Sequence, residues 1–134
     1  LGDALRRRFV FIEITTTNEI ITRIKNDFQD FLKAINYNGD IKVAEILFEI
    51  FEKINNIKEL GIGILKEMIS YSENFVDKKD KVSIPVSRFL IPFFENDIKY
   101  KRVIDVLEEY KDKGIELDVI NQLKKLNTGY YEES

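Results

Sequence analysis

Apolar residues recur every three or four positions through most of the chain, which is the spacing of one face of an α-helix. The pattern predicts a first helix over residues 17–36 and a second over residues 41–55. Apolar side chains cover most of the circumference of the second helix, so we expect it to be the most buried one. The polar turn between them contains Gly39, which can adopt a positive φ and end the first helix.

A third and a fourth helix are predicted in the middle of the chain. The third follows Gly63 and runs to about Val76. Residues 77–81 are mostly charged and are expected to form an exposed loop. Ser83 is expected to cap the fourth helix, and Pro92 should kink or split it because the proline ring clashes with the preceding turn.

The spacing of apolar residues predicts two more helices in the last third of the chain. One spans residues 98–111, with Asp97 as its cap and Gly114 closing it. A short sixth helix begins near Leu117 and ends near Gly129, and the residues after it should fray. The predicted fold class is therefore mainly α, a bundle of about six helices.

The N-terminal segment follows a different pattern. Residues 9–14 are aromatic or β-branched with little alternation, which suits a strand covered on both faces. No second convincing strand follows, and a lone strand cannot satisfy its own backbone groups. Because the chain also begins with Leu1 and not with Met, we expect this strand to be the remnant of a sheet in a larger protein.

Composition narrows the possible functions. A length of 134 residues suits one domain, and 44% hydrophobic with 34% charged residues indicates a folded protein. The net charge of −3 and the mixed signs argue against a broad basic face for nucleic acid. No apolar run approaches the roughly 20 residues of a membrane helix, so we expect a cytoplasmic protein without membrane contact. Since cysteine and histidine are absent, no disulfide, thiol chemistry or metal site is predicted.

Three adjacent arginines, Arg6, Arg7 and Arg8, precede the predicted strand and are half of the six arginines in the chain. Guanidinium is a permanent, planar cation that matches phosphate oxygens two at a time. A solvated basic cluster is the simplest alternative, because arginine is common on surfaces. A phosphate anchor for nucleic acid is another.

The segment Ala4-Leu5-Arg6-Arg7-Arg8-Phe9 closely resembles the "ALRRRF" segment of AAA+ proteins of the McrB, MoxR and dynein-related branch. The resemblance implies that residues 1–14 end the nucleotide-binding core and that residues 15–134 form the helical lid, with a hinge at 15–18. It makes Arg8 the first candidate for an arginine finger that reaches the γ-phosphate of a neighbouring subunit, and Arg7 the second. Arg6 would contact the same phosphate or pair with an acid.

The short segment Gly61-Ile62-Gly63 can be read simply as a turn between helices. By the resemblance, it occupies the sensor-2 position of the lid, which faces the nucleotide and is Gly-x-(Gly/Ser) in McrB-type proteins. Lys66 is the nearest cation and could substitute for the sensor-2 arginine of other branches. Residues 89–97 are similar to the "IIPLLxEY" stretch of such lids, and residues 123–130 are similar to their C-terminal end.

The chain departs from the family because it lacks the Walker A, Walker B and sensor 1 motifs. The larger protein would bind ATP or GTP with Mg²⁺ in its core, and would drive DNA restriction or protein remodelling. Its partners would be the AAA+ core domain and neighbouring subunits of a homo-oligomeric ring, a hexamer, with nucleic acid involved only indirectly. Alone, this chain should bind no cofactor and hydrolyse no nucleotide. The alternative is a small helical protein-interaction module without nucleotide binding.

Overall fold

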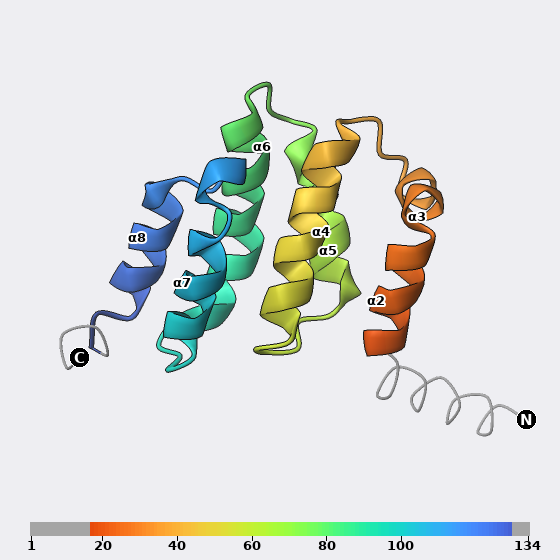
Figure 1. The fold of residues 1–134 in the computed structure, drawn as a ribbon. Helices are drawn as coiled ribbons and strands as arrows, with labels where there is room; N and C mark the ends of the chain where they lie inside the picture. The colour runs from red at the N-terminus through yellow and green to blue at the C-terminus, as the bar shows by residue number, and fades with distance from the viewer. Residues whose placement is uncertain (1–16, 130–134) are drawn as a thin grey trace, which may run out of the picture. The chain divides into compact units, whose positions relative to one another are not determined.

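The computed structural model describes residues 17–129, and this part of the chain is mainly helical, as predicted (Figure 1). The predicted strand at residues 9–14, the arginine triplet and the predicted frayed end lie outside the described residues. The described part contains seven α-helices: α2 (Thr17–Asn26), α3 (Phe28–Ala34), α4 (Ile41–Asn55), α5 (Ile62–Ser72), α6 (Lys78–Pro85), α7 (Tyr100–Glu108) and α8 (Leu117–Leu126).

The chain divides into two compact units, with the division between Asn36 and Tyr37. The boundary predicted at residue 14 falls outside the described residues and stays a prediction. The unit that begins at Tyr37 contains α4 to α8 together with three short turns of other helix types.

The first predicted helix is in fact two, α2 and α3. Asp27 leaves the helical region with φ −124° and ψ 48°, and its side chain makes no capping hydrogen bond to α3. Bonds of 3.0 Å from the amide of Asp27 to the carbonyl of Arg23, and from Phe31 to Asp27, keep the two helices connected. The predicted turn follows α3, and in it Asn36 takes the left-handed conformation with φ 58°. Gly39 could adopt a positive φ but does not do so.

Helix α4 is the centre of the second unit, and its predicted bounds are confirmed. The carboxylate of Asp40 caps it by accepting the amide hydrogen of Lys42 at 2.8 Å. Nine of its 15 residues are buried, more than in any other helix of the described part. It packs against α5, α6 and α7, so the prediction that this helix is the most buried is also confirmed.

Helix α6 corrects two predictions. Residues 78–81, expected in an exposed loop, form its first turn. Lysine is a good helix former, and Asp80 partly offsets the unfavourable interaction of the first-turn lysines with the helix dipole. Ser83, expected to cap this helix, lies inside it and is buried, and its hydroxyl donates to the backbone carbonyl of Gly114.

The helical run continues past α6 with a change of helix type around Pro92. A π-helical turn, η1 (Val86–Leu90), is followed by a 3₁₀ turn, η2 (Ile91–Phe94). The amide of Ile91 reaches the carbonyl of Val86, five residues back. Pro92 has no amide hydrogen to donate, and its ring crowds the carbonyl four residues earlier. The predicted disturbance at Pro92 is therefore present as a switch from π to 3₁₀ geometry.

The loop between α7 and α8 has a position that only glycine fits well. Helix α7 is shorter than the predicted 98–111 and is followed by the 3₁₀ turn η3 (Lys111–Lys113). Gly114 then takes φ 122°, and a Cβ added there would lie 2.9 Å from the Cβ of buried Val82. The loop thus approaches α6 closely at Gly114.

We expect Gly114→Ala to lower the free energy of unfolding by about 2 kcal/mol, since it combines backbone strain with overpacking against Val82. Urea denaturation measures this. Gly63→Ala is the control, because its added Cβ meets nothing within 4 Å; its stability should be unchanged or slightly raised. Equal effects of the two substitutions would contradict the assignment of a tight approach at Gly114.

None of the helices within residues 17–129 combines the length and the apolar character needed to cross a lipid bilayer.

Candidate functional site

The predicted nucleotide-facing residues lie together at the start of α5. Gly61 is the residue before the helix, with φ 91° and ψ 151°, and it provides no side-chain cap. A Cβ at Gly61 or at Gly63 would meet no atom within 4 Å, so the backbone is open on that side. Lys66 lies one turn further along and is exposed. The first amides of a helix have no partner within it, so this start can approach an anionic group.

The turn that leads into Gly61 is held by the end of α4. The side-chain carbonyl of Asn55 accepts the amide hydrogen of Leu60 at 2.8 Å, and Asn55 itself is only 7% exposed. The amides of Ile57 and Lys58 both donate to the carbonyl of Ile54, at 2.9 and 3.0 Å. The role of Asn55 was not predicted, because an Asn at the end of an apolar helix gives no sign of its partner.

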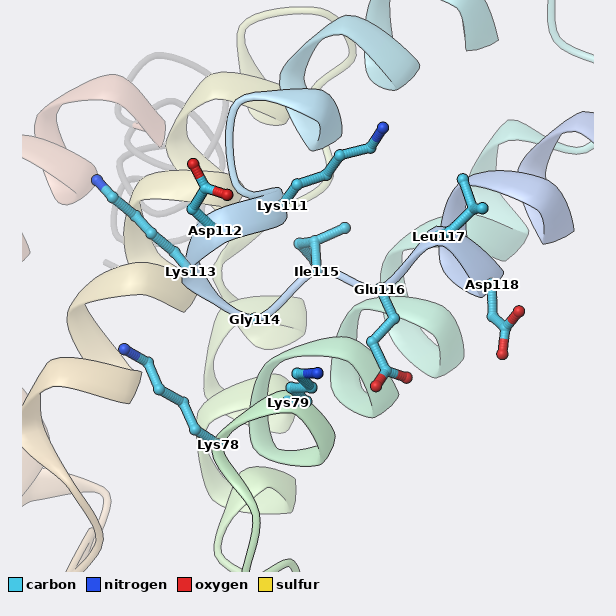
Figure 2. A pocket seen from close by; sticks show the side chains of 10 residues that line it. All are labelled: Lys78, Lys79, Lys111, Asp112, Lys113, Gly114, Ile115, Glu116, Leu117 and Asp118. Atoms are coloured by element: carbon cyan, nitrogen blue, oxygen red, sulfur yellow. The ribbon is translucent and has the colours of Figure 1, made fainter.

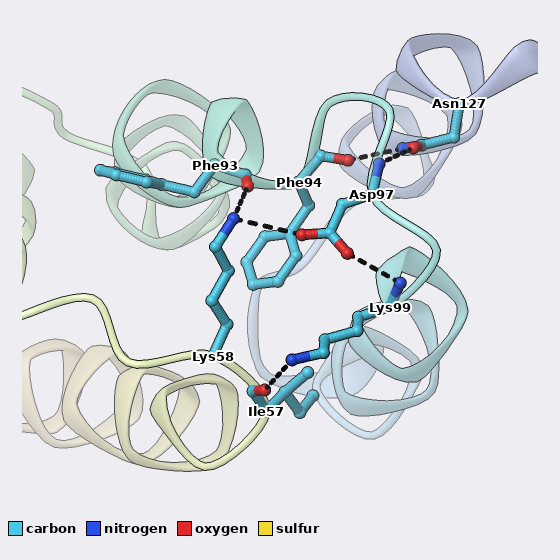
Figure 3. A network of polar contacts seen from close by, with 7 residues as sticks. All are labelled: Ile57, Lys58, Phe93, Phe94, Asp97, Lys99 and Asn127. Atoms are coloured by element: carbon cyan, nitrogen blue, oxygen red, sulfur yellow. Dashed lines mark hydrogen bonds and ion pairs between the residues drawn. The ribbon is translucent and has the colours of Figure 1, made fainter.

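Lys58 connects this turn to the loop between η2 and α7 (Figure 3). Its ammonium group donates to the carbonyl of Phe93 at 2.8 Å and lies 3.1 Å from the carboxylate of Asp97. Phe93 lies near the C-terminal end of η2, where the backbone carbonyls carry partial negative charge and a cation is favourable. The same ammonium lies 5.4 Å from the centre of the Phe94 ring.

Asp97 was predicted to cap the helix after it, and its carboxylate does accept the amide hydrogen of Lys99, at 2.9 Å. Helix α7 begins three residues after Asp97 and not directly at Ile98. That backbone bond is the main reason why the pKa of Asp97 is below its ordinary value, and the ammonium of Lys58 lowers the pKa further. Asp97 is thus held in its charged form.

We expect Asp97→Asn to destabilise the protein near neutral pH, and the difference from wild type to shrink in acid. A carboxylate with a lowered folded pKa stabilises the fold above its ordinary pKa of about 3.9, and that contribution is lost as the pH falls through the folded pKa. Urea denaturation at several pH values between about 3 and 7 measures this. A stability difference that does not change with pH would contradict the assignment.

Asn127, at the end of α8, is hydrogen-bonded to the loop between η2 and α7. Its side chain is fully buried, at 0% exposure, and makes three hydrogen bonds. The side-chain oxygen accepts from the amide of Asp97 at 2.8 Å, and the side-chain nitrogen donates to the carbonyls of Phe94 and Leu123 at 2.8 and 2.9 Å. Asn127 therefore joins α8, η2 and the loop between η2 and α7 (Figure 3).

Two surface hollows occur elsewhere in the second unit. One, of about 650 Å³, lies between the start of α6 and the loop before α8, and four lysines line it (Figure 2). Three carboxylates share that lining, and Lys111 is paired with Glu108 at 2.7 Å. Figure 2 shows Lys111 extending away from Lys78 and Lys113, so the ammonium groups do not converge.

The other hollow lies along α8 and is lined by residues between Asp118 and Thr128. Neither of these two hollows includes Gly61, Ile62, Gly63 or Lys66. At the start of α5, Gly63 and Lys66 are exposed, and Gly61 and Ile62 are partly exposed.

The structure brings only part of the predicted site together. Gly61, Ile62 and Gly63 are consecutive at the start of α5, with Lys66 on the following turn. Arg6, Arg7 and Arg8 lie outside the described residues, so their relation to this turn stays a prediction. Residues 17–129 contain no group of three or more acidic side chains placed to hold a metal ion.

Comparison of the chain with protein-family models, with curated proteins and with solved structures finds no match. The resemblance to AAA+ proteins therefore rests on the residues quoted for it.

Proposed function

We propose that this chain is the C-terminal part of an AAA+ nucleotide-hydrolysing motor of the McrB-like type, which supplies an arginine finger and a helical lid to a ring. The observation that carries the proposal is the segment Ala4-Leu5-Arg6-Arg7-Arg8-Phe9. The order of features after it agrees with the proposal. An α-helical region follows, and in it the glycine pair of Gly61 and Gly63 opens a helix.

The chemistry assigned to the triplet is stabilisation of charge. Transfer of a γ-phosphoryl group spreads negative charge over its equatorial oxygens, and a cation from a neighbouring subunit stabilises that charge. Arg8 directly precedes the predicted strand and is proposed as the finger. Arg7 and Arg6 would contact the same phosphate or hold Arg8 in place. The nucleotide, ATP or GTP, and Mg²⁺ would be held by the core domain.

The role assigned to the lid is closure over the bound nucleotide. Its proposed contact is the start of α5, where backbone amides and the exposed Lys66 are available to an anionic ligand. Closure would occur about the predicted hinge at residues 15–18, and the ring would pass this change to the next subunit.

Two measurements test the proposal. The protein encoded by the complete reading frame should contain a Gly-x-x-x-x-Gly-Lys-(Ser/Thr) motif before Leu1 and should hydrolyse nucleotide. The 134-residue chain alone should show no hydrolysis, because it has neither Walker motif. Turnover by a clean preparation of this chain would contradict the proposal. A reading frame without that motif would favour the protein-interaction module.

A further inference from the structure

Two lysines cross between the α4–α5 turn and the η2–α7 loop in opposite directions (Figure 3). Lys58, on the turn, reaches the carboxylate of Asp97 at 3.1 Å. Lys99, next to α7, reaches back to the carbonyl of Ile57 at 3.4 Å. We call Lys58, Asp97 and Lys99 the lysine bridge. It joins segments that are about 40 residues apart in sequence, since the two contacts span 39 and 42 positions.

The lysine bridge differs from an ordinary surface ion pair, which contributes little. Each carboxylate oxygen of Asp97 has its own donor, the amide of Lys99 on one and the ammonium of Lys58 on the other. The side chain of Asp97 is only 19% exposed, and its backbone amide is fixed by buried Asn127. The acceptor at the centre of the bridge is therefore held rigidly, and it can define the position of Lys58.

Gly61 has no side chain to define where α5 begins, so the position of that helix start depends on the turn before it. We propose that the lysine bridge sets the position of this turn, and that Lys58 and Asp97 are thereby positioning residues for nucleotide binding at the start of α5. This inference rests on the proposed function for its ligand. The geometric part, that the lysine bridge fixes the turn, can be tested on this chain alone.

Amide hydrogen exchange on the 134-residue chain tests the geometric part. The probe is the amide of Leu60, which is bonded to Asn55 and does not touch the lysine bridge. Lys58→Met should speed its exchange by about tenfold or more, because the turn loses its charge-assisted anchor. Glu59→Gln, at the exposed neighbouring position, is the control and should leave the exchange rate unchanged. Lys58→Arg keeps a cation opposite Asp97 and should largely restore slow exchange.

Nucleotide kinetics of the protein with its P-loop core test the positioning role. Lys58→Met should raise the KM for nucleotide about tenfold and leave kcat within about twofold, since no reacting group is removed. Asp97→Asn should act in the same direction, and Glu59→Gln should change neither constant. If Lys58 only stabilised the fold, Lys58→Met would lower the amount of folded protein. It would not raise KM while leaving kcat unchanged.

The outcomes separate this inference from the proposed function. If Leu60 exchanges equally fast in Lys58→Met and Glu59→Gln, the lysine bridge does not fix the turn and the inference is overturned. If exchange accelerates but KM is unchanged, the positioning role is overturned. If no form of the protein hydrolyses nucleotide, the proposed function fails and the positioning role fails with it, while faster exchange still shows that the lysine bridge fixes the turn.

Discussion

Arg8→Ala is expected to lower nucleotide hydrolysis by the assembled protein by about 10³- to 10⁵-fold, an effect of about 4–7 kcal/mol on the transition state. The proposed finger stabilises negative charge that develops as the γ-phosphoryl group is transferred. The loss of activity in Arg8→Ala should therefore appear in kcat. Nucleotide affinity should change far less, because the proposed core domain would hold the bound nucleotide. Steady-state kinetics together with equilibrium nucleotide binding measure both quantities.

A matched arginine is available as the control. Arg23 lies on α2 and is exposed, and no catalytic role is proposed for it. Arg23→Ala should leave kcat within about twofold of wild type. Arg8→Lys keeps the charge but loses the planar fork, so it should recover only part of the activity. If Arg8→Ala behaved like Arg23→Ala, the finger would have to be reassigned to Arg7 or Arg6, or abandoned.

Asn127→Ala is expected to lower the free energy of unfolding by about 3–5 kcal/mol. The buried amide side chain makes three hydrogen bonds, to Asp97, Phe94 and Leu123. Its removal leaves one donor and two acceptors without partners, and each such buried group costs about 1–3 kcal/mol. The substitution also creates a cavity. Urea denaturation followed by circular dichroism measures the change.

Thr128→Ala is the control for this effect. Each of the last four backbone carbonyls of α8 accepts a hydrogen bond. The donor to the carbonyl of Lys125 is the exposed hydroxyl of Thr128. Because water can replace that hydroxyl, Thr128→Ala should cost less than about 1 kcal/mol. Asn127→Asp should be at least as harmful as Asn127→Ala, since a carboxylate cannot donate to either carbonyl. Equal stabilities for Asn127→Ala and Thr128→Ala would contradict the role assigned to the buried amide.

Local patterns predicted the helices that bury one well-defined face. Helix α4 agrees with its predicted bounds because its apolar residues are dense and Asp40 marks its start. Helix α8 likewise begins at Leu117, as its apolar spacing indicates. The first turn of α6 was not predicted because its charged residues resemble a loop in sequence, although lysine has a high helix propensity.

The contacts around the candidate site were not predictable in the same way. Asn55, Lys58 and Asn127 act through side-chain bonds, and for Lys58 and Asn127 the partners in the η2–α7 loop are 30 to 39 positions away. Hydrophobic periodicity says nothing about such partners. The glycine pair at the start of α5 was recognised through the family resemblance, and its open backbone became visible only from the positions of surrounding atoms.

The most direct test of the central claim, that Arg8 acts on the nucleotide of a neighbouring subunit, is a mixing experiment. Subunits with Arg8→Ala are combined with subunits in which the P-loop lysine of the core is replaced, and hydrolysis is measured. Each variant alone should be nearly inactive. In a randomly mixed ring, half of the sites keep an intact P-loop and half of these face an intact Arg8, so about one quarter of wild-type turnover should return. No recovery in rings shown to contain both subunits would contradict action across the subunit boundary.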